Sequence, residues 1–316
     1  MRTDKDSFYL GIDAGGTKCE LMIADVNLKK IYESKFKSLH YSIVGAKVIA
    51  EKFSALIKTV LKKNKLDIKN CKGICIGLAG ARENADRKSL KKEFSKRLKF
   101  DKIRIETDTM TGLYGAFNGA DGLILISGTG SVLFGKSGEK IYRVGGWGRI
   151  LGDEGSGYWI GLQALKNAVK EYDLLQKPQS SQRKTKPLPK KSLLARSLEK
   201  KYALNEINIV EQVFHGNFPI QNVAPLVLKL AGKKDKVCLK IVNDAIDGLL
   251  HHLETFLKVA RRKKSIDVAF IGSIIETDNP LSKKFKQRIK KELPLINVVK
   301  KKNPPVYGAI ILASKF

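Results

Sequence analysis

The chain carries the glycine-rich stretch GIDAGGTK at residues 11–18, directly after the apolar residues Phe8-Tyr9-Leu10. A second glycine-rich stretch, SGTGS at residues 127–131, lies between the apolar runs 123–126 and 132–134. Each stretch predicts a β-hairpin with a tip too crowded for side chains, where glycine lets the backbone turn its N–H groups toward an anion. Because both tips carry hydroxyls and Asp13 lies on the first incoming strand, the pair predicts two turns that hold a polyphosphate.

The bulk composition is that of an ordinary globular chain with an unusual charge. The 316 residues fit two domains. No apolar run approaches the ~20 residues of a membrane span, and the N-terminus shows no apolar secretion segment, so we expect a cytoplasmic protein without a membrane partner. Lys and Arg number 60 against 31 Asp and Glu, a formal charge of +29. The lysines are spread over nearly every expected helix with few aromatic residues among them, which predicts solvated helix faces and not nucleic-acid binding as the main function.

The order of the apolar segments predicts two tandem α/β units. Residues 8–34 indicate three strands, and a helix at 46–63, a buried strand at 73–78, a helix at 87–98 and a short strand at 103–106 follow. A second version begins with the hairpin at residue 123. We expect a first domain at residues 1–112 plus about 300–316, where an apolar helix returns, and a second at 113–299. The second domain should contain a helical insertion and a basic, proline-broken loop at 176–191.

Two aspartates are placed to support phosphoryl transfer. Asp13 would repel a nucleotide unless a divalent cation lay between them, so its natural partner is Mg²⁺, held through water. Asp108 ends a short strand where a helix can begin, and a carboxylate there can accept the proton of an attacking hydroxyl. The alternatives are that Asp13 caps its own turn and that Asp108 is a helix N-cap.

The segment GGWGRILGDEGSGYW at residues 145–159 is poor material for a core and suits a sugar pocket. Carboxylates accept hydrogen bonds from vicinal hydroxyls, glycine amides donate, and an indole face stacks on the C–H surface of a ring. The alternative is that Asp153 and Glu154 only begin the next helix. The four histidines lack metal-binding spacing, and Cys71 and Cys75 are expected to be inert packing residues.

With these residues in place, the chain resembles the N-acetylglucosamine kinase branch of the BadF/BadG/BcrA/BcrD ATPase family, within the actin/hexokinase/Hsp70 superfamily. The motifs are GIDAGGTK (11–18), GLAGA (77–81), TD (107–108), ISGTGS (126–131), GGWGRILGDEGSGYWIG (145–161) and IGS (271–273). The resemblance implies an α/β fold of two tandem ribonuclease-H-like domains with an interdomain cleft that holds ATP and Mg²⁺, Asp108 being the base for a sugar 6-hydroxyl. It implies ATP contacts from Gly15, Gly16, Thr17, Lys18, Ser127, Gly128, Thr129, Gly130, Ser131, Gly272 and Ser273, and sugar contacts from His40, Gly80, Ala81, Asp108, Trp147, Gly148 and Asp153.

The sequence departs from that family pattern at His40, Arg82 and Arg149, which could favour an anionic or larger sugar such as an N-acetylmuramic type. Two other functions stay open. One is a sugar-sensing or nucleotide-binding protein without turnover. The other is an ATPase activator of an acyl-CoA dehydratase, which needs exposed cysteines near the second hairpin, although no cysteine occurs between Cys75 and Cys238. A homodimer through the helical part of the second domain is plausible for the family.

Overall fold

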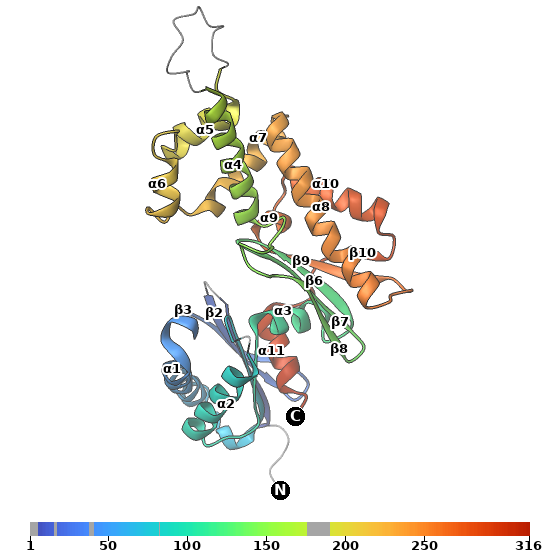
Figure 1. Cartoon of the computed structure of the whole chain (residues 1–316). Helices are drawn as coiled ribbons and strands as arrows, with labels where there is room; N and C mark the ends of the chain where they lie inside the picture. Colours follow the sequence, from blue (N-terminus) through green and yellow to red (C-terminus); the bar gives the residue numbers. More distant parts are fainter. Residues whose placement is uncertain (1–5, 16–17, 38–40, 82, 176–189) are drawn as a thin grey trace, which may run out of the picture. The chain divides into compact units, whose positions relative to one another are not determined.

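The computed structural model describes the chain except residues 1–5, 16–17, 38–40, 82 and 176–189 (Figure 1). The chain divides into two compact units, Met1–Gly122 with Lys300–Phe316 (unit 1) and Leu123–Val299 (unit 2). Each contains a five-stranded sheet among its described residues, so the expected two-domain α/β fold is confirmed. The division falls at Gly122 and not at residue 112, because helix α3 (Asp108–Phe117) packs against the C-terminal helix α11 (Pro305–Ala313) within unit 1.

The sheet of unit 1 has the order β3-β2-β1-β4-β5. β1 pairs antiparallel with β2 and parallel with β4, so the first glycine-rich stretch joins two strands of a hairpin, as predicted. The strands are β1 (Phe8–Ala14), β2 (Lys18–Asp25), β3 (Lys30–Lys37), β4 (Cys71–Leu78) and β5 (Ile103–Glu106). The 3-10 turn η2 (Ile68–Asn70) leads into β4.

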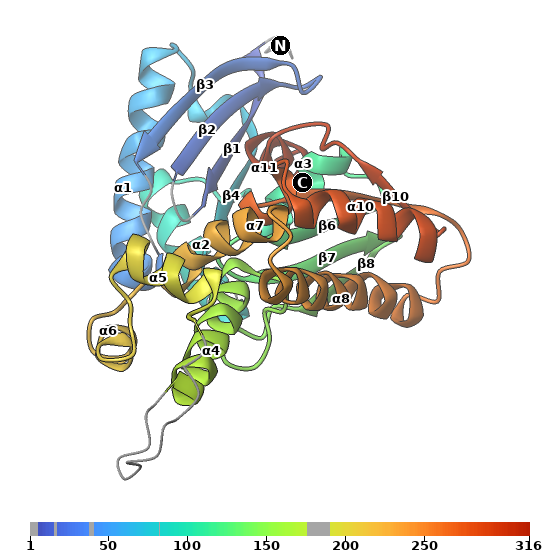
Figure 2. The same cartoon turned by 90° about the horizontal axis from the view of Figure 1, so that it is seen from above.

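Helices cover both faces of the unit 1 sheet (Figure 2). Alternate residues of β1 point to opposite faces. Leu10 and Ile12 pack with the helices α1 (Tyr41–Lys63) and α2 (Asn84–Leu98), whereas Tyr9 packs on the α11 face. The backbone of α1 is non-helical at Gly45, and the part of the helix after this kink matches the predicted 46–63. The apolar C-terminal helix returns to this unit, as expected.

The sheet of unit 2 has the order β10-β9-β6-β7-β8. Its strands are β6 (Gly122–Ser127), β7 (Ser131–Ser137), β8 (Lys140–Gly145), β9 (Ile266–Ile271) and β10 (Ile296–Val299). The three residues between β6 and β7 are too few for a crossover, so these neighbouring strands form the second predicted hairpin. The long amphipathic helix α8 (Lys236–Val259) packs on β7 and β8, and Phe285 of α10 (Pro280–Glu292) stacks on Phe270 of β9 at 5.4 Å.

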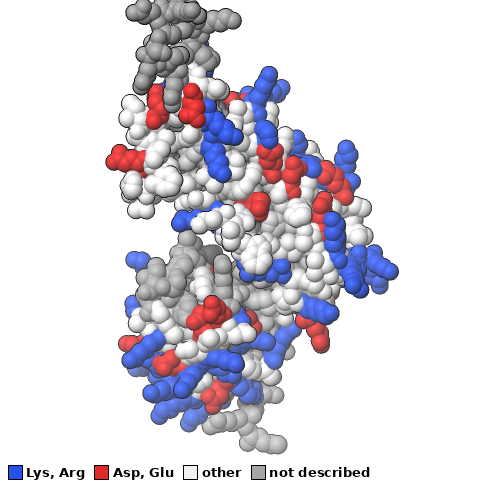
Figure 3. Space-filling model, viewed as in Figure 1, with Lys and Arg blue, Asp and Glu red and all other residues white. Residues whose placement is uncertain are grey.

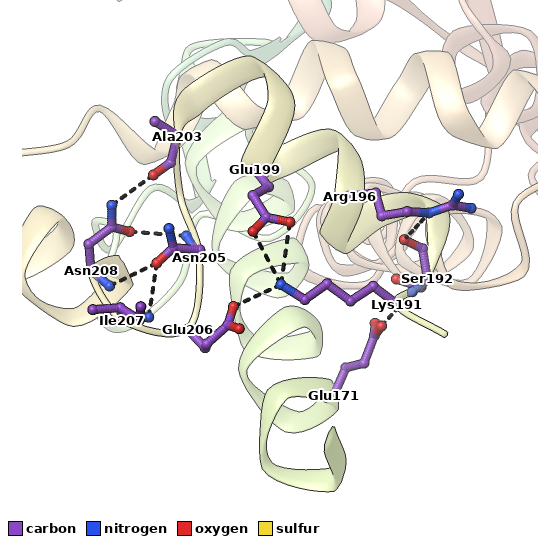
Figure 4. A network of polar contacts seen from close by, with 10 residues as sticks. All are labelled: Glu171, Lys191, Ser192, Arg196, Glu199, Ala203, Asn205, Glu206, Ile207 and Asn208. Carbon is purple, nitrogen blue, oxygen red and sulfur yellow. Dashed lines mark hydrogen bonds and ion pairs between the residues drawn. The ribbon is translucent and has the colours of Figure 1, made fainter. Parts of the chain in front are cut away.

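Helix α4 (Gly157–Leu175) contacts α5 (Leu193–Tyr202), η3 (Ile220–Val223), α7 (Ala224–Gly232) and α8. The short α6 (Ile209–Phe214) follows α5 in the chain, and the short α9 (Ser273–Glu276) contacts β9 and α10. Figure 4 shows polar contacts that join α4, α5 and the segment just before α6. The ammonium of Lys191 contacts Glu199 at 3.2 Å and Glu206 at 2.9 Å, and Glu171 of α4 accepts from the Ser192 amide. Most of the predicted loop 176–191 lies outside the described residues.

Lysine and arginine side chains are spread over the face seen in Figure 3 and are not gathered in one patch. Many lie on exposed positions of helices, for example Lys62, Lys91 and Lys200. This distribution agrees with solvated helix faces. Among the described residues, no helix is both long and apolar enough to cross a membrane.

Candidate functional site

In unit 1, a buried polar contact joins the end of β1 to the first turn of α3. Asp13 is 7% exposed, and its Oδ1 lies 2.5 Å from the hydroxyl oxygen of Thr111, which is fully buried. The same hydroxyl lies 2.8 Å from the carbonyl oxygen of Asp108. A hydroxyl has one proton, and a carboxylate is the stronger acceptor, so we assign the donation to Asp13. Because Thr111 lies in α3 one turn after Asp108, its hydroxyl ties the expected metal-binding aspartate to the helix that bears the expected base.

Thr111 reaches Asp13 because β4 has a glycine at the crossing point. A β-carbon on Gly77 would lie 2.5 Å from the methyl carbon of Thr111 and 3.3 Å from Oδ1 of Asp13. Any larger residue at position 77 would push α3 away from β1. Thr111 is not among the site residues expected from the sequence, although the GLAGA motif that contains Gly77 marks the place where such close packing occurs.

Asp108 is the first residue of α3, and the N-cap of this helix is Thr107. The Thr107 hydroxyl accepts from the Met110 amide at 3.2 Å, so the alternative of an N-cap aspartate is wrong. One carboxylate oxygen of Asp108 accepts from the Thr109 amide at 2.9 Å, and the side chain is half-buried. A carboxylate in the first helical turn is stabilised by the helix dipole. The arrangement holds this carboxylate at a partly open helix end, where a substrate hydroxyl can reach it.

In unit 2, the second glycine turn and the 145–159 segment are bonded into one piece. The Ser127 hydroxyl donates to the Gly155 carbonyl at 2.8 Å, and the Ser131 hydroxyl donates to the Glu154 carbonyl at 2.6 Å. In the reverse direction, the first amides of α4 donate to the turn, from Gly157 to the Gly128 carbonyl at 2.7 Å and from Tyr158 to the Thr129 carbonyl at 3.2 Å. The two serine hydroxyls thus hold the loop in this structure, whereas the sequence predicted that they would donate to a phosphate. Thr129 is exposed at the tip.

Asp153 lies against the same turn. It is 8% exposed and adopts the left-handed conformation, with φ of 60°. Its Oδ1 accepts from the Gly148 amide at 3.3 Å, and a β-carbon on Gly130 would lie 2.8 Å from its Oδ2. Its carboxylate therefore lies between the Trp147-Gly148 part of the loop and the second glycine turn. Trp147 is 71% exposed.

The IGS turn also reaches the second glycine turn. β9 runs parallel to β6, with Ile271 opposite Ile126, and Gly272 then crosses the end of β6. A β-carbon on Gly272 would lie 2.4 Å from the Ser127 carbonyl oxygen, so only glycine fits there. Ser273 is exposed beside it. Unit 2 therefore brings together Ser127–Ser131, Trp147-Gly148, Asp153 and Gly272-Ser273.

The other expected site residues are described only in part. Gly16, Thr17, His40 and Arg82 lie outside the described residues, and the side chain of Lys18 is not described. Gly15 follows the end of β1, and Gly80 follows β4 with φ of 91°. Ala81 is fully buried, so only its backbone could meet a substrate, and Arg149 lies over the ring of Tyr158 at 5.6 Å.

The described residues hold no cluster of three or more His, Cys, Asp or Glu side chains suited to a metal. This pattern is compatible with Mg²⁺, which proteins often bind through one or two carboxylates together with waters and substrate phosphates. Asp13 supplies one such carboxylate at a strand end. The four cysteines are buried and free, and burial raises the pKa of the Cys19 and Cys71 thiols to about 12. Burial likewise raises the pKa of Cys75. They are packing residues, as predicted for Cys71 and Cys75.

Nearly the whole chain is similar to known proteins. The model of the BadF/BadG/BcrA/BcrD ATPase family matches residues 10–313. An N-acetylmuramic acid/N-acetylglucosamine kinase of Clostridium acetobutylicum is 29% identical over 97% of this chain and 98% of its own. An N-acetyl-D-glucosamine kinase of Dictyostelium discoideum is 26% identical over 96% and 97%. A crystal structure from Chromobacterium violaceum, provisionally named an N-acetylglucosamine kinase, superposes with a TM-score of 0.66 at 20% identity, covering 97% and 98%.

Proposed function

The chain belongs to the BadF/BadG/BcrA/BcrD ATPase family, and on that premise we propose that it is an ATP-dependent amino-sugar kinase. The acceptor is the 6-hydroxyl of N-acetylglucosamine or of a related sugar such as glucosamine or N-acetylmuramic acid. The observation that carries the proposal is the buried contact from Asp13 through Thr111 to the start of the helix that bears Asp108. It would hold the proposed cation-binding carboxylate and the proposed proton acceptor in fixed positions within one unit.

In the proposed reaction, the sugar hydroxyl oxygen attacks the γ-phosphorus of ATP. The bond from that phosphorus to the β,γ-bridging oxygen breaks, ADP leaves, and the hydroxyl proton passes to the carboxylate of Asp108. Bound Mg²⁺ would neutralise phosphate charge, and Asp13 would hold it through water. In unit 2, phosphate contacts come from the backbone of the second glycine turn and from Thr129 in this proposal. The adenosine lies near Gly272-Ser273 in this proposal.

The choice of an amino sugar is supported by two observations. The relatives that cover nearly the whole chain are named as kinases of N-acetylglucosamine or N-acetylmuramic acid. In this chain, the buried Asp153 carboxylate and the exposed Trp147 ring lie on one loop. A carboxylate can accept from sugar hydroxyls while an indole stacks on the ring. Arg149 lies on the same loop and could meet the lactyl carboxylate of N-acetylmuramic acid.

The experiment is a coupled ADP-release assay with Mg·ATP and a panel of N-acetylglucosamine, glucosamine, N-acetylmannosamine, N-acetylmuramic acid and glucose. We expect turnover with at least one amino sugar, and loss of turnover in Asp108→Asn with ATP still bound. Asp101→Asn, at an exposed position before β5, is the matched control and should keep full activity. Undiminished turnover in Asp108→Asn would remove this residue as the base. Binding of sugar and nucleotide by the wild type without ADP release would favour the sensor.

The activator alternative receives less support. Such an activator holds an iron–sulfur cluster between its subunits through accessible cysteine thiolates, whereas every cysteine of this chain is buried. Burial raises the pKa of the Cys75 and Cys238 thiols well above the ordinary value.

A homodimer also remains a proposal. Helix α6 and the turn that precedes it expose Ile207, Val210 and Phe214, at 88%, 62% and 75%, and such an apolar surface favours self-association.

A further inference from the structure

A buried histidine of α8 lies beneath the loop that carries Asp153. His252 is 3% exposed, and its Nδ1 lies 2.7 Å from the carbonyl oxygen of Gly248, one turn earlier in the helix. A carbonyl can only accept, so Nδ1 carries the proton and Nε2 is left as an acceptor. That Nε2 has no hydrogen-bond partner among the described residues. A buried polar atom without a partner is costly, so its position calls for an explanation.

The unpaired Nε2 faces the place where the loop begins. A β-carbon on Gly145, the last residue of β8, would lie 2.0 Å from Nε2. The imidazole therefore occupies the space that a side chain at position 145 would need. Gly145 also has φ of 72°, a conformation that other residues rarely adopt. The loop leaves β8 over this ring.

The far end of the same loop rests on the same helix. A β-carbon on Gly248 would lie 2.5 Å from Cβ of Glu154. One on Gly155 would lie 2.5 Å from the side chain of Leu249 and 2.7 Å from the Ala245 carbonyl oxygen. Positions 245, 248, 249 and 252 have the spacing i, i+3, i+4 and i+7, so they form one face of α8. Both ends of the loop thus touch this face, which we call the α8 seat.

We propose that the α8 seat, Ala245, Gly248, Leu249 and His252, is a positioning device for the Asp153 loop and so for sugar recognition. The ring of His252 sets the distance between α8 and Gly145, where the loop starts. Gly248 allows Glu154, near the end of the loop, to lie close to α8. Asp153 lies between these two supports, so a shift of either one moves its carboxylate relative to Gly130. The link to sugar recognition rests on the proposed kinase function, whereas the seat itself does not.

Two variants and one control test the seat in the full-length chain. His252→Ala removes the ring from under Gly145. Gly248→Ala adds a methyl group that must displace Glu154, yet alanine is the better helix former by about 1 kcal/mol, so the helix itself is not weakened. His251→Ala is the matched control, because His251 is the neighbouring residue and is exposed on the other side of the helix.

The first measurement is amide hydrogen exchange of peptides covering residues 145–156, with a β9 peptide (266–271) as the internal reference. We expect faster exchange of the loop, with an unchanged β9, in both seat variants and not in His251→Ala. Unchanged loop exchange in both, or an equal rise in β9, would overturn the proposal. This measurement needs no activity, so it decides on the seat even if the chain is not a kinase.

The second measurement separates positioning from stability. Displacing a substrate-orienting group by about 1 Å can cost on the order of 100-fold in rate. We expect Gly248→Ala to lower kcat/KM for the sugar by about 10-fold or more when the assay is run well below the melting temperature of the variant, where the chain is fully folded. A fall in melting temperature with an unchanged kcat/KM would assign the seat a structural role only and overturn the positioning proposal. Absent turnover in the wild type would instead refute the kinase function.

Discussion

Thr111→Val tests whether the buried contact to Asp13 is as important as its geometry indicates. Valine has nearly the shape of threonine, so the packing of the Thr111 methyl group against Gly77 is retained while the hydroxyl is lost. Asp13 is 7% exposed and would lose a 2.5 Å donor that water cannot readily replace. A hydrogen bond to a charged group contributes about 1.5–3 kcal/mol, so the free energy of unfolding of unit 1 should fall by that amount.

Unfolding in urea is followed by circular dichroism, and hydrogen exchange of a peptide covering β1 assigns the loss to unit 1. Thr59→Val is the matched control. Its hydroxyl contacts a carbonyl oxygen of its own helix at 2.9 Å but lies at an exposed position without a carboxylate, so the cost should stay within about 0.5 kcal/mol. A cost as small in Thr111→Val would refute the reasoning, because Asp13 would then not depend on this donor.

Two further predictions concern other parts of the chain. Burial raises the pKa of Glu106 above 4.5 despite the nearby Arg104, so the folded state holds this proton more tightly than the unfolded chain does. The stability of the wild type should therefore fall relative to that of Glu106→Gln as the pH rises from below 4.5 through the raised pKa. Thermal melts of both proteins at several pH values measure this difference. A rise in the relative stability of the wild type over that range would contradict the prediction. If α6 mediates self-association, Phe214→Ser should lower the sedimentation coefficient of the protein at micromolar concentration, whereas equal values for variant and wild type would exclude that face.

Much of the fold follows from the sequence because its signals are local. The buried strand that contains Cys75 is a continuous apolar run, and the helix predicted at 46–63 matches the main part of α1. The domain boundary was misplaced because the sequence shows where α3 begins but not that it packs against α11, nearly two hundred residues later. Residue spacing carries no information on such a long-range pairing.

The candidate site was predictable to the level of motifs and not to the level of hydrogen bonds. Asp13 and Asp108 were identified by their strand-end positions, but Thr111, which joins them, resembles any threonine in a helix until Gly77 is seen to face it. His252 is likewise one of two adjacent histidines in the sequence. Only the helix phase places one of them in the core and leaves the other exposed.

The serines of the second turn have a structural role that the motif alone does not reveal. A serine next to glycines suggests a hydroxyl donor to phosphate, yet Ser127 and Ser131 donate to the carbonyls of Gly155 and Glu154. Any phosphate at this turn must then be bound by the backbone and by Thr129. The consequence is mechanical, because the same two hydroxyls fix the turn to the loop that carries Asp153. Within unit 2, the parts proposed to contact nucleotide and sugar are therefore positioned by one set of bonds, and a change that moves one of them should move the other.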